Sequence, residues 1–184
     1  MTDAVHIQAY DPAWPRRFRE EAARVRAVTG GREIEHHGST AVAGMPAKPV
    51  IDMMVAITSI AEGEDLAARL QARGYEPVDA SYRELMPERI VLVRRDGDGN
   101  RRCHVHLLLR DHAMWTRQIR FRDRLRADAE TARAYAELKR ALARRHGRDR
   151  HAYMMAKAAF IARVTDAVEA GDTAPAAARG EEAG

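Results

Sequence analysis

The stretch EHHGSTAVAGMPAKPVIDMMV, residues 35–55, determines the fold that we expect for this chain. Residues 49–57, which include the end of this stretch, are almost continuously apolar, as is typical of a strand in the interior of a sheet. One acid, Asp52, interrupts the apolar run. Because a carboxylate in a buried strand is costly without a partner, we expect a metal, an arginine or a substrate group beside Asp52.

The residues before this strand have the composition of an anion-binding loop. Gly38 allows the backbone to come close to a ligand, and Ser39 and Thr40 offer hydroxyl and backbone N–H donors. Lys48 adds a positive charge beside the same loop. We therefore predict that Gly38, Ser39, Thr40 and Lys48 hold a phosphate-carrying ligand next to Asp52. The alternative is an ordinary glycine–serine turn that binds nothing.

Hydrophobic periodicity predicts the remaining elements. Apolar residues that alternate or run together predict strands at residues 5–9, 33–37, 49–57, 75–78, 89–95 and 102–110. Apolar residues at helical spacing predict helices at residues 12–29, 62–73, 114–126, 130–146 and 150–168. This order predicts an α+β fold, in which a mixed sheet is flanked by helices and the C-terminal helices cover one side. We expect one domain over residues 1–171 and a flexible tail over 172–184.

Composition excludes several classes of protein. Hydrophobic residues make up 46% of the chain and charged residues 32%, which indicates a globular protein. No apolar run approaches the roughly 20 residues that span a bilayer, so we expect no membrane association. The net charge is only +4 and aromatic residues make up 5%, so we do not expect nucleic acid as the main partner. The single cysteine excludes an intrachain disulfide, and the N-terminus lacks a signal-peptide pattern, so we expect a cytoplasmic protein.

Lysine is scarce in this basic chain. Among 31 basic residues only Lys48, Lys139 and Lys157 are lysines. A lysine presents a compact ammonium group where the planar guanidinium of arginine does not fit. We interpret the three lysines as candidate ligand contacts, with chance retention as the alternative.

Several motifs together resemble one family. They are YDPAWP at residues 10–15, the stretch 36–52, HVH at 104–106, FRDRLR at 121–126 and YAELK at 135–139. In this order they resemble the GrpB (UPF0157) family of the nucleotidyltransferase (polymerase-β-like) superfamily. The resemblance covers roughly residues 5–168. It implies a nucleotidyltransferase-like fold and a group-transfer reaction on a nucleotide.

The resemblance also implies roles for particular residues. In the superfamily a glycine–serine turn holds the nucleotide phosphates, and Gly38 and Ser39 match this turn. Two or three strand carboxylates hold a divalent metal, usually Mg²⁺, and Asp52 matches the first. The second acid is expected two residues later, where this chain has Met54. The third is expected on a neighbouring strand, for which residues 102–110 are the candidate.

That neighbouring strand offers histidines instead of acids. His104 and His106 point to one face because they are two residues apart, and His36 lies close before the glycine–serine turn. We predict Asp52, His104 and His106 as catalytic residues, and Asp52, His36, His104 and His106 as candidate metal ligands. Such a set suits Zn²⁺, Fe²⁺ or Mn²⁺ better than Mg²⁺. The alternative is a metal-free role as general acid or base, or as phosphate ligands.

The helices after residue 113 offer further candidates. Tyr135 and Lys139 are one helical turn apart and share a face. We predict that Arg122, Arg126, Tyr135, Lys139 and Lys157 line a pocket for an anionic or nucleotide ligand. The alternative for each is a solvated helix face.

Three classes of function follow from these features. The first is a nucleotidyl- or other group-transfer enzyme acting on a nucleotide or another anionic small molecule. The second is a metal- or histidine-assisted enzyme of different chemistry, such as a hydrolase, cyclase or ligation-like enzyme. The third is a non-catalytic nucleotide-binding module. The absence of an acid at Met54 keeps the second and third classes open.

Overall fold

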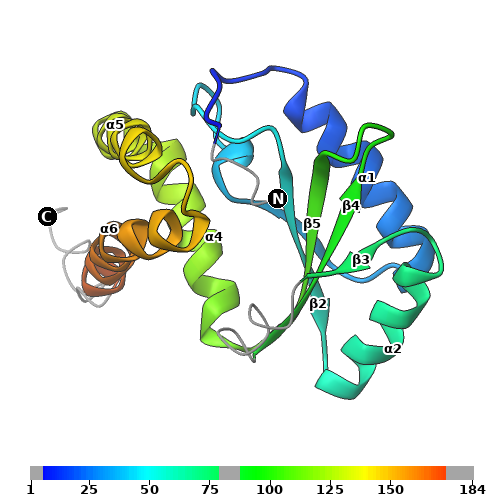
Figure 1. The fold of residues 1–184 in the computed structure, drawn as a ribbon. Helices are drawn as coiled ribbons and strands as arrows, with labels where there is room; N and C mark the ends of the chain where they lie inside the picture. The colour runs from blue at the N-terminus through cyan, green and yellow to red at the C-terminus, as the bar shows by residue number, and fades with distance from the viewer. Residues whose placement is uncertain (1–5, 79–87, 173–184) are drawn as a thin grey trace, which may run out of the picture.

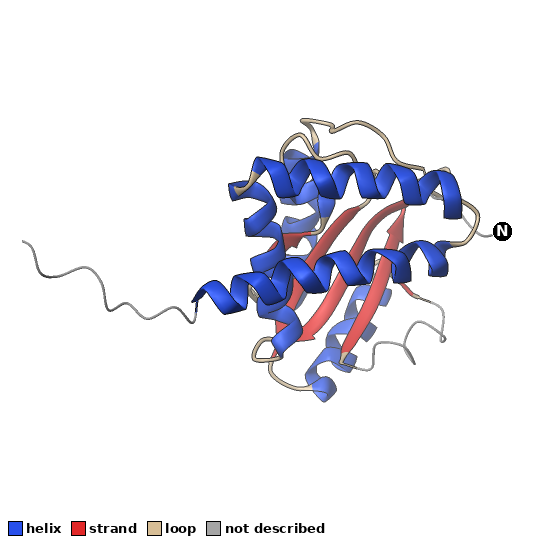
Figure 2. Ribbon diagram, turned by 90° about the vertical axis from the view of Figure 1, so that its left-hand side faces the viewer, coloured by secondary structure: helices blue, strands red, loops and turns tan. Residues whose placement is uncertain are grey.

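The computed structural model of the chain describes residues 6–78 and 88–172 and has three layers (Figure 1). A sheet lies between two groups of helices, so the expected α+β fold is confirmed. One face of the sheet is covered by α1 (Trp14–Thr29) and α2 (Ile60–Gln71). The helices on the other side are α4 (Ala113–Ala127), α5 (Ala129–His146) and α6 (Arg150–Asp172), which Figure 2 shows in front of the strands.

The sheet has five strands in the order β1-β2-β5-β4-β3. They are β1 (Ile34–His37), β2 (Ile51–Ile57), β3 (Glu76–Pro77), β4 (Arg89–Arg95) and β5 (Arg101–Leu109). β2 and β5 are parallel, and the other neighbouring pairs are antiparallel. The sheet is therefore mixed, and the apolar stretch forms the interior strand β2, as its composition predicts.

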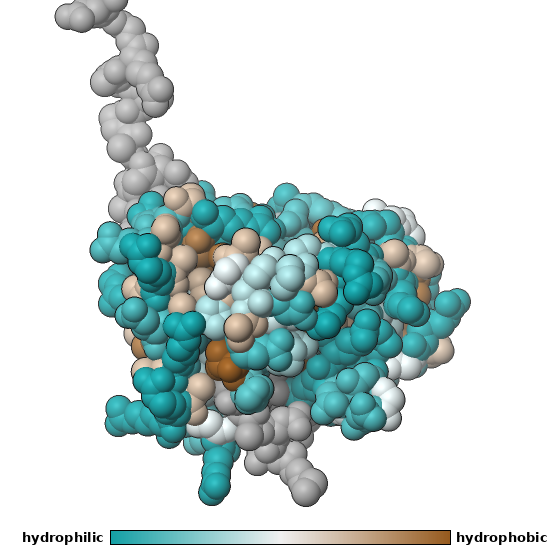
Figure 3. Space-filling model, turned by 90° about the horizontal axis from the view of Figure 1, so that it is seen from above, coloured by the Kyte–Doolittle hydropathy of each residue, from teal (hydrophilic) through white to brown (hydrophobic). Residues whose placement is uncertain are grey.

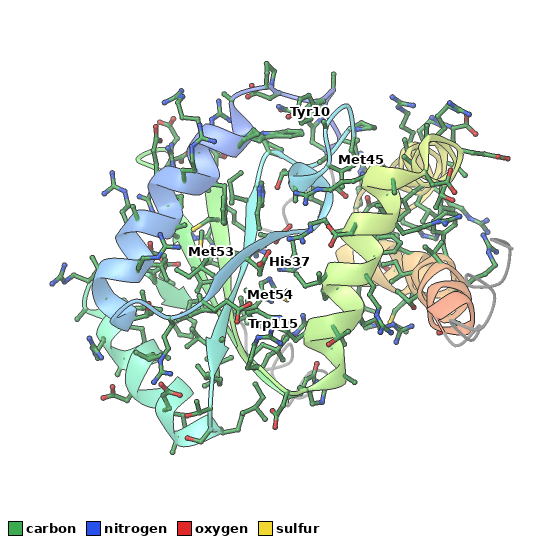
Figure 4. All side chains as sticks on the ribbon, turned by 180° about the vertical axis from the view of Figure 1, so that it is seen from behind. Tyr10, His37, Met45, Met53, Met54 and Trp115 are labelled. Atoms are coloured by element: carbon green, nitrogen blue, oxygen red, sulfur yellow. The ribbon has the colours of Figure 1, made fainter. Side chains whose placement is uncertain are left out.

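Successive residues of β2 point to opposite faces of the sheet. Met53 belongs to the large core beneath α1 and α2. Met54 lies on the other face, where it packs with Trp115 of α4. Figure 4 shows Met53 directed toward α1, and Met54, His37 and Trp115 on the side of α4. Asp52 shares the face of Met54, because the two residues are two positions apart.

Apolar packing differs between the two faces of the sheet. The core toward α1 and α2 is continuous and includes the fully buried Trp14, Val25 and Leu70. Each such side chain stabilises the fold by about 1.5–3 kcal/mol on burial. The other side holds two smaller clusters, one around Trp115 and one around Tyr135. Asp52, at the beginning of β2, belongs to neither cluster, so the second face leaves room for polar groups.

Some element boundaries differ from the sequence-based expectation. Gln8 forms only an isolated bridge with Ala47, so the described residues 6–9 do not form the strand expected at residues 5–9. α2 begins before residue 62, because the Ser59 hydroxyl accepts a hydrogen bond from the Glu62 N–H and caps the helix. A short 3₁₀ helix, η1 (Ser39–Ala41), follows Gly38. The expected tail begins at the last residue of α6, and residues 173–184 lie outside the described part.

Within residues 6–78 and 88–172, no helix combines the length and apolar character needed to cross a bilayer. The face seen in Figure 3 is mostly hydrophilic, with small separate apolar patches.

Candidate functional site

Gly38 brings the turn after β1 into contact with Asp52. Its φ of 71° lies in the left-handed region, which favours glycine. A Cβ atom at this position would lie 2.9 Å from Asp52 Oδ2 and 3.3 Å from Asp52 Cβ. Only glycine fits here without displacing the carboxylate, so the turn and β2 meet at the predicted anion-binding residues.

The parallel pairing of β2 with β5 places histidines beside Asp52. Asp52 lies opposite His104 and Met54 lies opposite His106. His104 Nδ1 is 2.8 Å from Asp52 Oδ1, a hydrogen bond, and His106 Nε2 is 3.9 Å from the same oxygen. One ligand atom from each of the three residues lies within 4.8 Å of the others. The structure thus brings together the predicted catalytic residues Asp52, His104 and His106.

Burial and charge act in opposite directions on these groups. Burial alone would raise the pKa of Asp52, but its contacts with His104 and His106 outweigh burial and hold the pKa well below its usual range. Burial lowers the pKa of His106 to about 4, although Asp52 opposes this shift. At neutral pH the site therefore contains an ionised carboxylate and a neutral His106 imidazole.

His37, which sequence analysis did not select, is a third imidazole on this face. The antiparallel pairing of β1 with β2 places His37 opposite Asp52, and its ring centroid is 4.9 Å from that of His106. Both ring nitrogens are buried and have no hydrogen-bond partner among the described residues. Burial lowers the pKa of His37 to about 3. Only one of two adjacent histidines on a strand can face Asp52. The position of His37 directly before the glycine turn was the signal in the sequence that could have selected it.

His36, the histidine that was selected as a metal ligand, lies on the opposite face. Its ring stacks on Phe18 of α1, with centroids 4.3 Å apart and an angle of 5° between the planes. Its Nε2 is 3.0 Å from Thr40 Oγ1, and burial lowers its pKa to about 4. The structure does not bring His36 to the cluster, so we remove it from the candidate ligand set.

A cavity of about 160 Å³ opens beside Asp52. It lies between the loop before β2, the beginning of β2, β5 and the helices α5 and α6. Its wall consists of Ile7, Ser39, Thr40, Ala47, Lys48, Val50, Asp52, His104, His106, Lys139, Tyr153, Met154 and Lys157. All three lysines of the sequence line this one cavity, together with the two hydroxyl residues of the loop.

Aromatic rings hold the three lysines in place. The Tyr153 ring contacts two of them, with the Lys157 Nζ at 4.5 Å and the Lys48 Nζ at 5.1 Å from its centroid. Lys139 Nζ lies 4.9 Å from the centroid of Tyr135. Each lysine therefore has a fixed aromatic neighbour, which limits the freedom of its long side chain.

Lys139 is the most buried of the three lysines. Its Nζ donates hydrogen bonds to Ser39 Oγ at 2.9 Å and to the carbonyl oxygen of Pro46. Burial, together with the positive charges of Lys157 and Arg140, lowers the pKa of Lys139 to about 7. The ammonium group therefore reaches the tip of the glycine–serine turn and lacks a carboxylate partner among the contacts that the structure shows.

The two predicted ligand contacts on α4 lie elsewhere. Arg122 donates to Glu35 Oε2 at 2.6 Å and to the His36 carbonyl at 2.9 Å, which ties α4 to β1. Arg126 donates to the Ala41 carbonyl at 2.8 and 3.1 Å, which ties α4 to η1. Neither lines the cavity, so we assign both arginines to holding the helix layer on the sheet.

Tyr135 also lies outside the cavity wall. Its ring packs between Phe121 and Phe160, with centroids 5.1 and 5.3 Å away. Burial raises the pKa of Tyr135 well above its usual range, although a hydrogen bond with Ser39 opposes this shift. Tyr135 therefore supports Ser39 and Lys139 from behind and is not placed to touch a ligand in the cavity.

Comparison with known families identifies the chain. The family model described as GrpB protein matches residues 4–167. The chain belongs to the GrpB family. The sequence-based resemblance to this family is thereby confirmed.

Curated relatives of this GrpB chain are UPF0157 proteins of several bacteria. The Pseudomonas aeruginosa relative is 39% identical over 168 residues, which covers 88% of this chain and 66% of that protein. The Streptomyces coelicolor relative is 35% identical over 158 residues, covering 85% and 80%. A dephospho-CoA kinase of Mycobacterium bovis is 40% identical over 70 residues, which are 35% of this chain and 17% of the kinase.

Solved structures agree with the family. The crystal structure of conserved protein GrpB from Enterococcus faecalis has a TM-score of 0.77 at 30% identity and covers 91% of this chain and 99% of that one. Cid1 poly(U) polymerase, in a form described as bound to Mg and 3′-dATP, has a TM-score of 0.52 at 14% identity and covers 76% and 44%. The second likeness concerns the fold alone, and it confirms the nucleotidyltransferase-like architecture.

The donor set of the GrpB chain does not fit the Mg²⁺ site expected of the superfamily. Mg²⁺ requires oxygen ligands in octahedral geometry. The position of the expected second acid holds Met54, which is 1% exposed and packs with Trp115. The neighbouring strand supplies the imidazoles of His104 and His106, so Asp52 is the one carboxylate of the metal-like cluster that the described residues form.

Proposed function

We propose that this GrpB protein binds a nucleotide or another anionic small molecule through its phosphate-type group and catalyses a group-transfer reaction on it. The observation that carries the proposal is the gathering of all three lysines, Lys48, Lys139 and Lys157, around one cavity. Chance placement would scatter them over a surface on which arginine is the ordinary cation. Compact ammonium groups suit a narrow site for an anionic head group.

The size of the cavity limits which part of a ligand enters it. A volume of about 160 Å³ is close to that of an engineered protein cavity of about 150 Å³ that holds one benzene molecule. This volume accepts one or two phosphate groups but not a whole nucleotide. The base and sugar would therefore lie outside, and the cavity recognises charge and shape at one end of the ligand.

Ser39 and Lys139 are the centre of the proposed anion contact. The Ser39 hydroxyl accepts from Lys139 Nζ at 2.9 Å, and the Pro46 carbonyl takes a second ammonium hydrogen, so the third hydrogen of Lys139 Nζ remains to donate to a ligand oxygen. Hydrogen bonds to a charged group contribute about 1.5–3 kcal/mol each. Three such contacts near the upper end of this range reach the roughly 8 kcal/mol that micromolar binding requires.

Asp52 and His104 stand next to this anion position. Both line the cavity, and their hydrogen bond fixes the His104 ring. Without a metal, the pair can take the proton of an attacking hydroxyl, in the way that an oriented carboxylate–imidazole pair acts as a general base. This placement favours catalysis over simple binding.

A screen of anions tests the proposal. We expect pyrophosphate, ATP, UTP or dephospho-CoA, the last chosen because of the similarity to a dephospho-CoA kinase, to raise the thermal midpoint of the wild type. A ligand present at 100 times its Kd stabilises the folded state by about 2.7 kcal/mol. Lys139→Met should abolish the shift, because it removes the central ammonium group and keeps the volume of the side chain.

The matched control removes a positive charge from the exposed face of the same helix. Arg144 of α5 is exposed, so Arg144→Met should retain the wild-type shift. Equal shifts in wild type and Lys139→Met would contradict the proposal.

A non-catalytic nucleotide-binding module is the second candidate function. Met54 favours it, because an acid is expected at that position in a nucleotidyltransferase. Ligand binding that depends on Lys139, without turnover of any nucleoside triphosphate and without an effect of Asp52→Asn on product formation, would select this candidate.

A further inference from the structure

We infer that Asp52, His104 and His106 bind one divalent transition-metal ion of the Zn²⁺ class, in place of the pair of Mg²⁺ ions that a nucleotidyltransferase-like fold suggests. The three side chains come from two neighbouring strands and reach one point, with one ligand atom from each within 4.8 Å of the others. The metal binding rests on this geometry alone; a shared role with the anion rests on the proposed function.

The shape of the cluster differs from an ordinary hydrogen-bonded triad. Asp52 Oδ1 faces two imidazole nitrogens, and the nearer, His104 Nδ1, forms a hydrogen bond at 2.8 Å. His106 Nε2 points to the same oxygen from 3.9 Å, which is too far for a hydrogen bond. Metal–nitrogen and metal–oxygen bonds are about 2.0–2.2 Å long, so one cation can replace the hydrogen bond of His104 and bind all three side chains after small movements, with His104 Nδ1 releasing its proton.

The buried polar atoms of the cluster lack partners. Neither His104 Nε2 nor His106 Nδ1 has a hydrogen-bond partner among the described residues. A buried polar atom without a partner costs about 1–3 kcal/mol, and such atoms often indicate a missing water or ion. With a cation on the nitrogens that face Asp52, these two nitrogens carry the N–H of each ring and need an acceptor such as water.

The donor types select the class of metal. Two imidazoles and one carboxylate match catalytic zinc sites with three protein ligands, which leave one position open for water or substrate. Mg²⁺ prefers oxygen ligands throughout. His37, whose ring meets that of His106 edge to face, does not join the three ligands but fixes the ring of His106.

The open position of such a site would face the cavity that the three lysines line. Asp52, His104 and His106 all belong to the cavity wall. A carboxylate beside an anion repels it, whereas a cation held by that carboxylate attracts it. The metal site and the anion site are therefore neighbours, and each should strengthen binding at the other.

Metal titration of the full chain tests the inference. The protein is treated with a chelator, dialysed and titrated with Zn²⁺ by calorimetry and with Co²⁺ by visible absorption, in the absence of any anion. We expect one ion per chain and Co²⁺ bands typical of mixed nitrogen and oxygen ligands. His104→Ala and His106→Ala should each weaken Zn²⁺ binding by at least about 100-fold, because removal even of an outer-shell partner costs 10–100-fold.

Two controls separate the outcomes. His151 of α6 is exposed, so His151→Ala should bind Zn²⁺ as the wild type does. Thermal midpoints show whether each variant folds. Because His104 is partly exposed and His106 is buried, His104→Ala still tests the inference if His106→Ala does not fold. Wild type that binds no Zn²⁺, or affinity unchanged in a folded His104→Ala, would overturn the inference.

Anion binding is then measured separately. Lys139→Met should bind Zn²⁺ normally and lose pyrophosphate, whereas His104→Ala should lose Zn²⁺. Zn²⁺ binding without any pyrophosphate binding would uphold the metal site and contradict the proposed function alone.

Discussion

Glu21 of α1 and Asp52 of β2 are acids on opposite sides of the sheet, and their surroundings differ. On the face toward α1, the fully buried Glu21 accepts hydrogen bonds from Arg94 and Arg102, both at 2.9 Å. On the opposite face, Asp52 meets imidazoles and lines a cavity. A carboxylate whose oxygens are bonded to guanidinium groups has no capacity left for a ligand.

The same contrast extends to the apolar residues around the acids. The face toward α1 and α2 is closed by a continuous core, whereas the face toward α4–α6 has two apolar clusters and a cavity beside Asp52. Because β2 belongs to both faces, adjacent residues of one strand serve different purposes. The site therefore depends on which residues of β2 point to the face toward α4–α6.

The largest effect should come from comparing two single variants that place an acid at adjacent positions of β2. Met53→Asp buries a carboxylate in the closed core, where Met53 is 0% exposed, and should destabilise the protein by more than about 4 kcal/mol. Met54→Asp introduces the acid on the face of Asp52 and the histidines. We expect Met54→Asp to be destabilised too, but Mn²⁺ or Mg²⁺ should restore part of its stability. Urea unfolding with and without the ion measures this recovery. Equal behaviour of both variants would contradict the contrast between the faces.

Next in size is the contact between the turn and Asp52. Gly38→Ala combines a positive φ with a Cβ atom 2.9 Å from Asp52 Oδ2, and we expect a loss of about 2–4 kcal/mol. Gly44→Ala is the matched control, because Gly44 has a φ of 73° and nothing within 4 Å of an added Cβ. Gly44→Ala should cost only about 1–2 kcal/mol. Urea unfolding of both variants isolates the clash, and identical losses would show that Asp52 does not require the glycine.

Charge on Lys139 should control anion binding between pH 6 and 8. The folded pKa of Lys139 is about 7, below its ordinary value of 10.5, so the ammonium group is lost as the pH rises through 7. Affinity for sulfate, which does not titrate in this range, should therefore fall with rising pH in the wild type. Calorimetry at several pH values measures this slope, and Lys139→Met should not show it.

The same shift has the opposite sign for stability. Between pH 7 and 10.5 the unfolded chain holds the proton of Lys139 more tightly than the folded chain. The free energy of unfolding should therefore rise with pH in this window, by up to about 1.4 kcal/mol per pH unit. Below pH 7 this contribution is constant. A wild-type slope equal to that of Lys139→Met would mean that burial does not shift the pKa of Lys139.

The smallest effect concerns the adjacent histidines of β1. His36→Phe keeps the stack on Phe18 but leaves the buried Thr40 hydroxyl without its partner, and should cost about 1–2 kcal/mol. His37→Phe replaces a ring whose two nitrogens have no partner among the described residues, and should leave the thermal midpoint unchanged or raise it. A greater loss in His37→Phe than in His36→Phe would indicate a bound partner at His37.

Much of the fold and part of the site could be predicted from local pattern. The alternation of strand residues was enough to place His104 and His106 on one face. That they meet Asp52 depends on the parallel pairing of β2 with β5; the family resemblance suggested that the two strands are neighbours, but not their relative direction. The scarcity of lysine indicated Lys48, Lys139 and Lys157, and these residues do line one cavity.

Other features depend on long-range packing that no local pattern encodes. The choice between His36 and His37 follows from the register of β1 against β2, which neither residue type determines. Arg122 and Arg126 resembled ligand contacts because they are cations in a family motif. The rotation of α4 about its axis directs them to backbone carbonyls instead, and that rotation is determined by the packing of the whole helix layer.

A crystal structure of the full chain soaked with Zn²⁺ and pyrophosphate tests the central claim most directly. We expect a phosphate group within hydrogen-bond distance of Ser39 Oγ and Lys139 Nζ, with the anomalous signal of zinc between Asp52, His104 and His106. The second surface cavity, lined by Arg126, Arg133 and Arg140, is the competing location for an anion. Pyrophosphate bound there, with the lysine-lined cavity holding only water, would contradict the account.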